Sequence, residues 1–268
     1  MLTEEEISKE IEWRNDVIYK SLTPYDGSGH FLDFDEIKMD MDSICSILFH
    51  IDSGDWSPEQ KTELMKTIVQ TFIQFLLTYI ENNSITVYYN LDDYKTFKSI
   101  YPDWCKERLS RYHNMEIRNI VDKIVISKLK RLSEMKPNIT VKQCEDSPIL
   151  DIYKDINNTN KRVVIISRDP HMLCLLAYKD LSIFNGRFFV DRNNYFSEKE
   201  YPAVHYTLIP SYFLIAGIKR NEYSGLPKYG KKKTDKLIND NKIGIIKQTL
   251  PELEPVNKYR KIFYLNEL

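Results

Sequence analysis

The chain lacks the features that mark several large classes of protein. Only four of its 268 residues are cysteines, and no two form a C-x-x-C pair. This argues against a structural zinc site and against a disulfide framework, and it favours a reducing compartment. The longest apolar stretch, residues 72–80, is interrupted by Gln74 and Thr78 and is too short to span a bilayer. The acidic start of the chain has no signal-peptide core, so we expect a cytoplasmic protein that is not secreted.

Charge of either sign is not in excess, with 38 basic and 39 acidic residues. This balance neither requires nor excludes nucleic acid as a partner, so the distribution of charge along the chain has to decide. Hydrophobic residues make up 42% and charged residues 29%, as in a globular protein with a sizeable core. Frequent Lys, Asn and Ile suggest an A·T-rich coding genome, which a virus, a phage or an A·T-rich microbe would have.

Apolar patterns predict strands that alternate with helices from about residue 30 to residue 190, which favours an α/β fold with a mostly parallel sheet. Ser57, Pro58 and Gln60 form a typical helix start, with a capping box and proline in the first turn. The predicted strands are 30–37, 85–89, 139–141 and 162–167, with a hairpin of 181–184 and 187–190 and a strand or strap at 262–265. The predicted helices are 3–21, 39–49, 57–82, 104–135, 149–156, 172–178, 210–217 and 233–241.

Acidic residues follow several of the predicted strands. Asp33 lies in the first strand, Glu145 and Asp146 come after the third, and Asp169 follows the apolar run Val163–Ile166. Function collects at the carboxyl ends of parallel strands, and carboxylates there can share one divalent ion. The alternative is that each acid caps a helix or stabilises a turn, roles for which Asp is common.

A dense basic cluster occurs in the segment Gly225–Thr234, which contains two glycines and leads into a predicted helix. Backbone N–H groups at such a helix start can hold a phosphate, and nearby lysines add charge. The candidate contacts with a nucleic-acid backbone are Gly230, Lys228, Lys231, Lys232, Lys233 and Lys236. The alternative is a solvated lysine-rich helix start.

Aromatic and basic residues are interleaved between Tyr94 and Arg108. Rings and cations in this pattern suit a single strand or a frayed duplex end. Alternatively, Phe97, Tyr101 and Trp104 pack into the core, and Lys98 and Lys106 are solvated.

Four segments in this order resemble the flap-endonuclease-like 5′-nucleases, whose fold is PIN-like. Residues 31–37 resemble the first strand, 87–108 the second strand and the entry to a helical arch, 163–176 a later strand and helix, and 213–238 the start of a helix-turn-helix element. The resemblance implies a nuclease-fold domain over 28–208 with an arch at about 94–136. It implies a small helical DNA-binding element at 209–245. Residues 1–27 and 246–268 are a helical extension and a tail outside the match.

The resemblance also implies site residues. Asp33, Glu145 and Asp169 match family acids that hold Mg²⁺ or Mn²⁺. Arg108 matches an arch residue that contacts the scissile phosphate, Lys98 takes the place of an arch arginine with the same role, and Lys106 lies beside a third arch position. Other family positions do not carry the expected residue. Family acids fall on Asn90, Pro148, His171, Ile218 and Asn221, and an arch lysine falls on Cys105.

Three hypotheses follow from this pattern. The first is a protein that binds branched or single-strand-ended DNA in replication or repair, with its catalytic metal site depleted and its nuclease activity weak or lost. The second is an active Mg²⁺- or Mn²⁺-dependent 5′→3′ exonuclease or flap endonuclease. The third is a non-catalytic structural or assembly subunit. RNA is an alternative ligand, protein partners would use the termini, and no membrane is expected.

Overall fold

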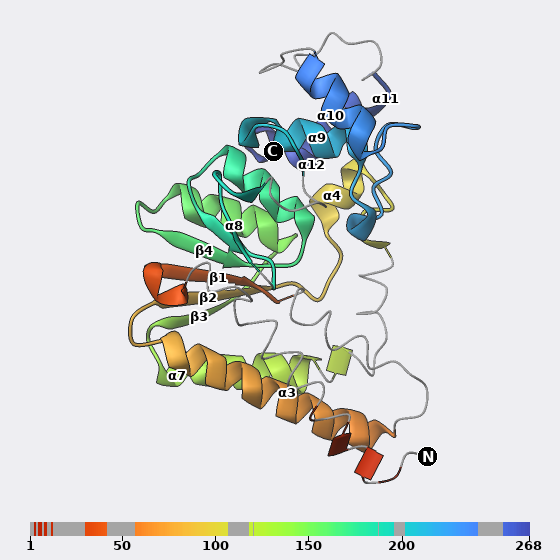
Figure 1. The fold of residues 1–268 in the computed structure, drawn as a ribbon. Helices are drawn as coiled ribbons and strands as arrows, with labels where there is room; N and C mark the ends of the chain where they lie inside the picture. The colour runs from red at the N-terminus through yellow and green to blue at the C-terminus, as the bar shows by residue number, and fades with distance from the viewer. Residues whose placement is uncertain are drawn as a thin grey trace.

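A computed structural model describes residues 30–41, 57–106, 118–119, 121–186, 188–195, 202–240 and 254–268, with Thr3, Glu5, Glu6, Ser8, Lys9 and Glu12 near the start (Figure 1). Most of the predicted helices 3–21 and 39–49 and much of the predicted arch, including Arg108, lie outside these residues. The domain boundaries given above remain predictions.

A six-stranded sheet forms the centre of the molecule, in the order β3-β2-β1-β4-β5-β6. All neighbouring strands are parallel except β5 and β6, which are antiparallel. The strands are β1 Glu36–Asp40, β2 Ser84–Tyr89, β3 Ile139–Gln143, β4 Val163–Ile166, β5 Ser182–Phe184 and β6 Phe189–Val190. The mostly parallel α/β fold predicted from the sequence is therefore confirmed.

Helices cover both faces of this sheet (Figure 1). Helix α3 (Pro58–Tyr79) and helix α7 (Ser127–Met135), which follows the π-helical turn Val121–Ile126, lie on one face. Helix α8 (Pro148–Asn157) and the 3-10 helix Pro170–Ala177 lie on the other face. This explains why Val163–Ile166 is continuously apolar: both of its faces are buried.

Helix α3 begins as its sequence predicts. Ser57 and Gln60 form the predicted capping box. The Gln60 N–H donates to Ser57 Oγ at 3.3 Å, and the Ser57 N–H donates to Gln60 Oε1 at 2.9 Å. Val69, Phe72 and Leu76 are buried at helical spacing. The apolar side of the helix therefore packs onto the sheet.

The predicted strand at residues 30–37 is wrong in its position. Phe31–Asp33 form a 3-10 turn, because Asp33 accepts the His30 N–H at 3.0 Å and closes a capping box. The Phe31 ring is fully buried among Phe75, Tyr79 and other rings. The strand begins at Glu36 and ends at Asp40, where the sequence pattern predicted the start of a helix.

Short helices assemble beside the sheet after residue 205 (Figure 1). They are the 3-10 turn Tyr206–Leu208, α9 Ile209–Ala216, the 3-10 turn Lys219–Asn221, α10 Lys231–Asp240, α11 Glu254–Asn257, α12 Arg260–Phe263 and the 3-10 turn Leu265–Glu267. The strand considered at residues 262–265 is wrong. Ile262 and Phe263 are instead fully buried in α12, which contacts α9 and α4 (Lys95–Ile100).

No helix in the described part of the chain combines the length and the apolar character needed to cross a bilayer.

Candidate functional site

Polar residues gather where four neighbouring strands end, as parallel pairing predicts. Asp40 is the last residue of β1, Asn90 follows β2, Glu145 and Asp146 come just after β3, and Asp169 follows β4. All except Glu145 are buried, with exposed fractions of 9% or less. We call these five residues the acidic edge.

Asp40 is the residue that the sequence interpretation missed. Its side chain is 2% exposed, and its Oδ2 accepts the Ser167 hydroxyl at 2.8 Å. Asp33 precedes β1 and so lies at the opposite edge of the sheet, and the structure does not bring it together with Glu145 and Asp169. A usable signal was present in Ile37-Lys38-Met39-Asp40, where apolar residues alternate with polar ones up to the acid.

Asp169 is held by protein donors on both carboxylate oxygens. Its Oδ1 accepts the His171 N–H at 2.9 Å, which caps the following 3-10 helix. Its Oδ2 accepts the Asn221 amide at 3.1 Å. Asn221 is fully buried and its Nδ2 also lies 3.4 Å from Cys105 Sγ, so an amide joins the sheet edge to the C-terminal helices.

Asp146 is also used in internal hydrogen bonds. Its Oδ2 accepts the Thr96 N–H at 2.5 Å and its Oδ1 accepts the Ser147 N–H at 2.7 Å. Asn90 donates its amide to the Asp146 carbonyl at 2.8 Å and accepts the Asp92 N–H at 2.7 Å. These bonds fix the ends of β2 and β3 and the start of α4.

A cleft of about 1240 Å³ opens beside Asp146. It is lined by the acids Asp92, Asp93, Glu145, Asp146 and Asp151, by Lys95, Lys142 and Lys154, and by Thr96, Gln143, Cys144 and Leu150. Burial raises the pKa of the Cys144 thiol well above its usual range, and Asp151 adds to the effect, so this thiol stays protonated. The cleft is therefore lined by side chains of both charges, and its cysteine, Cys144, is not an activated nucleophile.

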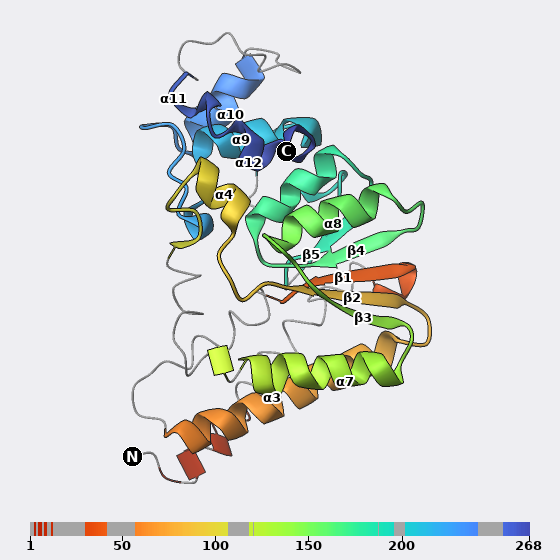
Figure 2. The same cartoon turned by 180° about the vertical axis from the view of Figure 1, so that it is seen from behind.

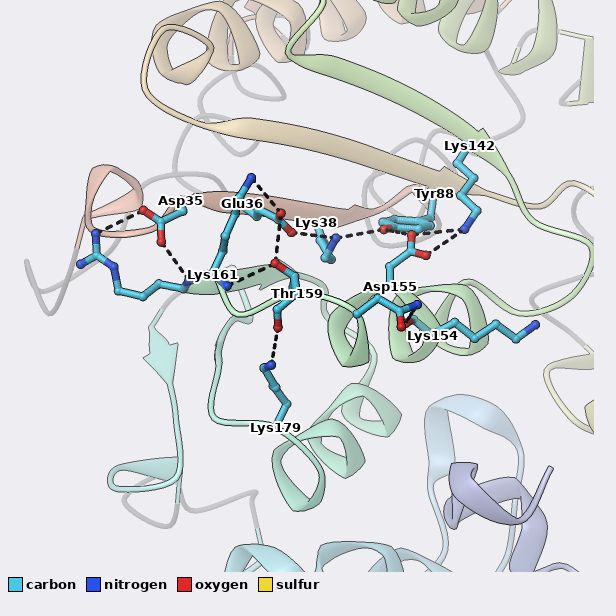
Figure 3. A network of polar contacts seen from close by, with 12 residues as sticks. Asp35, Glu36, Lys38, Tyr88, Lys142, Lys154, Asp155, Thr159, Lys161 and Lys179 are labelled. Carbon is cyan, nitrogen blue, oxygen red and sulfur yellow. Dashed lines mark hydrogen bonds and ion pairs between the residues drawn. The ribbon is translucent and has the colours of Figure 1, made fainter.

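A buried polar network runs under α8 from β1 to the cleft (Figure 3). Lys38, 5% exposed in the central strand, pairs with Glu36 at 3.1 Å and reaches the Tyr88 hydroxyl at 3.4 Å. Tyr88 donates to Asp155 at 2.7 Å, and Asp155 accepts Lys142 at 3.2 Å. Burial alone would lower the pKa of Lys142, but its bonds to Asp155 and Asp151 outweigh this and raise it.

The cations at the arch entry are paired with acids. Lys98 Nζ lies 2.6 Å from Asp93, and Arg118 lies 2.8 Å from Asp92. Lys106 is exposed and 3.3 Å from Asp103. Phe97 and Trp104 are fully buried, which confirms the core alternative for these two rings.

His171 is a core residue. It is 1% exposed, its ring lies against Phe97, Trp104 and Phe263, and its Nε2 is 2.8 Å from the Ile262 carbonyl. The histidine thus ties the C-terminal segment to the aromatic side chains packed beside the sheet.

The basic turn ahead of α10 is well formed. Gly225 has φ +65°, and Lys228 also adopts a left-handed conformation at φ +69°. Lys228, Lys232, Lys233 and Lys236 are exposed, and Gly230 has an open environment. Lys231 differs, because it pairs with Asp235 at 3.4 Å and lies over the Tyr212 ring.

Protein donors engage the buried carboxylates of the acidic edge within the described ranges. No group of three or more His, Cys, Asp or Glu side chains within the described ranges is arranged to hold a metal ion. The buried oxygens of Asp146 and Asp169 already accept protein N–H donors, and Asp40 accepts a hydroxyl. Mg²⁺ would compete with these bonds for its oxygen ligands.

No protein-family model matches the chain, and no curated protein matches it. Solved structures do. The chain matches a bacteriophage T5 5′-exonuclease with bound zinc at 16% identity, with 87% of each chain covered and a TM-score of 0.55. It matches a bacteriophage T5 flap endonuclease in complex with DNA and metal ions at 15% identity, with 86% of this chain and 87% of that chain covered and a TM-score of 0.54.

The chain has the flap-endonuclease-like 5′-nuclease fold. The resemblance inferred from four weak motifs is confirmed at the level of the fold. Within this fold, three residues named from the sequence, Glu145, Asp169 and Lys98, lie at the carboxyl edge of the sheet or directly beside it. The lysines of α10 lie on a separate helical element above that edge (Figure 1).

Proposed function

We propose that this protein binds branched or 5′-ended DNA through the 5′-nuclease fold and has weak or no hydrolytic activity. The fold supports the first part, since one structure that it resembles is a flap endonuclease bound to DNA. The exposed lysines around Gly230 support it as well. They present positive charge at a helix start, where phosphate oxygens are readily bound.

The observation that carries the second part is the bond between Asn221 and Asp169. The Asn221 amide, 3.1 Å from the buried carboxylate, hydrogen-bonds one of its oxygens and occupies an acceptor site that a cation could otherwise use. Two carboxylates at this distance would repel each other and favour a bound ion or proton. An amide also stands at Asn90, which donates to the backbone carbonyl of Asp146.

The acidic edge acts, on this view, as a structural junction. Asp40, Asp146 and Asp169 join four strand ends to α4 and to the C-terminal helices. In this proposal Lys98 and Arg118 remain near the DNA, held by Asp93 and Asp92 until phosphate competes for them. Lys228, Lys232, Lys233 and Lys236 contact the duplex backbone without reading its sequence.

The test is a labelled 5′-flap duplex incubated at low salt with Mg²⁺, Mn²⁺ or EDTA. Cleavage and mobility shift are read from the same samples. We expect a shift with all three additions and little or no cleavage. We also expect Asp40→Asn to leave the shift unchanged, provided that urea unfolding shows the variant to be folded.

Two outcomes would contradict the proposal. Metal-dependent cleavage that Asp40→Asn and Asp169→Asn both abolish would show an active nuclease. A complete lack of shift at low salt would favour the structural-subunit hypothesis. The binding surface itself is tested by Lys232→Gln/Lys233→Gln against the matched control Lys66→Gln/Lys161→Gln. These two control lysines lie on α3 and in the loop before β4.

A further inference from the structure

Two surfaces collect exposed basic side chains within the described ranges. One is the turn and helix α10 discussed above, where Lys231 pairs with Asp235. The other, which we call the α7 surface, is exposed, and it consists of Lys123, Lys128, Lys130, Arg131 and Lys136. Many other described cations are paired with a carboxylate, as Lys38, Lys98 and Lys142 are. The α7 surface has no role in the site described so far.

The orientation of α7 follows from its buried residues. Leu129 and Leu132, with Val125 in the preceding turn, are buried, and the helix contacts β3. The cations therefore occupy the sides that face solvent. Only two acids, Asp122 and Glu134, interrupt them between residues 121 and 136. The local charge is thus clearly positive in a chain whose formal net charge is −1.

The α7 surface starts beside the cleft. Lys130 Nζ lies 5.7 Å from the centre of the Tyr89 ring, and Tyr89 is the last residue of β2. The Tyr89 hydroxyl lies 3.3 Å from Gln143, which lines the cleft. Lys95, Lys142 and Lys154 also line it. Positive side chains therefore continue from the cleft onto α7.

The two basic surfaces lie at opposite ends of the molecule. Helix α10 is above the sheet, while α7 is below it, beside α3, and the same arrangement is seen from behind (Figure 2). A nucleic-acid strand that is bound at α10 and passes the carboxyl edge of the sheet would next reach the side of the molecule that carries α7. The α7 surface offers phosphate contacts that start beside that edge and continue along the α3 face of the sheet.

The composition of the surface favours a polyanion over a protein partner. Protein interfaces have an apolar or aromatic centre, and the one large apolar side chain exposed on α7 is Met135, at 67%. An interfacial membrane helix would need an apolar face directed outward, and the apolar face of α7 is buried. Lysines spread over 14 residues of helix cover about 20 Å, which matches several successive phosphates of one strand.

We propose that the α7 surface is a second nucleic-acid contact, which binds backbone phosphates of the strand that extends past the acidic edge. This inference rests on the proposed function, because it assumes that α10 holds the same nucleic acid. Binding is independent of sequence, since four of the five cations are lysines, which act as point charges toward phosphate.

The experiment measures the Kd of the whole protein for the 5′-flap duplex, and for the same duplex without the flap, as a function of salt. The variant Lys128→Gln/Lys130→Gln/Arg131→Gln should raise the Kd about tenfold at low salt and lower the log–log salt slope by about two to three. The variant Lys232→Gln/Lys233→Gln should weaken binding independently. Lys66→Gln/Lys161→Gln serves as the matched control. Urea unfolding confirms that each variant folds.

The outcomes separate this inference from the proposed function. If the α10 variant loses affinity while the α7 variant keeps the wild-type Kd and salt slope, the α7 inference is wrong and the proposed function stands. If the wild type binds neither duplex, both fail. If polyglutamate binds as tightly as the flap duplex and is lost with the same three substitutions, the surface recognises acidic protein chains and the assignment to nucleic acid is overturned.

Discussion

At the scale of single residues, two side-chain amides donate hydrogen bonds at the acidic edge. Asn90 and Asn221 stand at positions where the family resemblance leads us to expect carboxylates, and each donates a hydrogen bond toward its neighbours. Asn221 is fully buried and Asp169 is 8% exposed, so their bond lies out of solvent. A charge-assisted bond of this kind stabilises the fold.

Asn221→Asp should therefore destabilise the protein strongly at neutral pH. It places two carboxylates about 3 Å apart in a buried site, at an expected cost of about 3–5 kcal/mol in the free energy of unfolding. The loss should shrink as the pH falls toward 5, because one carboxyl of the pair then binds a proton. Urea unfolding at pH 5 and at pH 8 measures the difference.

Asn221→Ala is the control for this prediction. It removes the same hydrogen bond without adding charge, so its effect should be nearly the same at both pH values. A loss for Asn221→Asp that does not change with pH would show that Asp169 and residue 221 do not interact as carboxylates. Partial recovery of Asn221→Asp stability with Mn²⁺ would be consistent with a regenerated cation site.

At the scale of elements, the turn before α10 depends on one glycine more than on the other. Gly225 has φ +65°, and a Cβ there would overlap the Ile215 carbonyl and lie 2.5 Å from the Gly217 nitrogen. Gly230 has no heavy atom within 4 Å of such a Cβ and no left-handed φ. The turn therefore requires glycine at position 225, whereas position 230 can accept a side chain.

We expect Gly225→Ala to lower the free energy of unfolding by about 1–3 kcal/mol and to weaken DNA binding, because the strained turn carries the lysines. Gly230→Ala should change stability by less than about 0.5 kcal/mol. Denaturant unfolding and mobility shift on both variants provide the check. Equal effects of the two substitutions would contradict the assigned turn geometry.

The segment after β2 is a second element with a testable role. Asp92 and Asp93 line the cleft beside the acidic edge, and they pair with Arg118 and Lys98. DNA phosphates would have to compete with these carboxylates. Asp92→Asn/Asp93→Asn should lower the Kd for the flap duplex several-fold at low salt and steepen its salt dependence.

The same double variant should change the free energy of unfolding by less than about 1 kcal/mol, since both ion pairs are partly exposed. Asp103→Asn is the matched control, because Asp103 pairs with exposed Lys106 further along the chain. Unchanged affinity in the double variant would mean that Lys98 and Arg118 do not reach the DNA.

At the scale of the whole molecule, the core includes tyrosines as well as aliphatic side chains. Burial raises the pKa of Tyr88 and Tyr223 well above the usual value of 10.0, with help from Asp155 for Tyr88 and from neighbouring tyrosines for Tyr223. Burial also raises the pKa of Tyr212 to about 12. The folded state therefore keeps phenol protons that the unfolded chain releases near pH 10.

The contribution of these tyrosines to stability should be constant below about pH 10 and fall above it, because the unfolded chain binds fewer protons there. Each such tyrosine contributes at most about 1.4 kcal/mol per pH unit. Tyr88→Phe should lower stability at pH 8, where Asp155 loses a donor, but flatten the decline between pH 10 and pH 11. Urea unfolding across pH 8–11 tests this, and a profile with the same slope in both proteins would contradict it.

The sequence by itself determined the alternating order of helices and strands, the capped start of α3 and the basic turn before α10, because these depend on neighbours a few residues apart. The four motifs in the sequence were also sufficient to indicate the 5′-nuclease fold.

Tertiary structure alone decided which acids lie close together. Asp33 closes a local turn, while Asp40 ends a central strand. The polar alternation of Glu36, Lys38 and Asp40 hid a buried strand, because its polar side chains are paired with distant residues. Asp40, for example, pairs with Ser167, which lies 127 positions away. Asn221 reaches Asp169 across 52 residues for the same reason: a buried polar group takes the partner that the fold provides, and the linear sequence does not show which one that is.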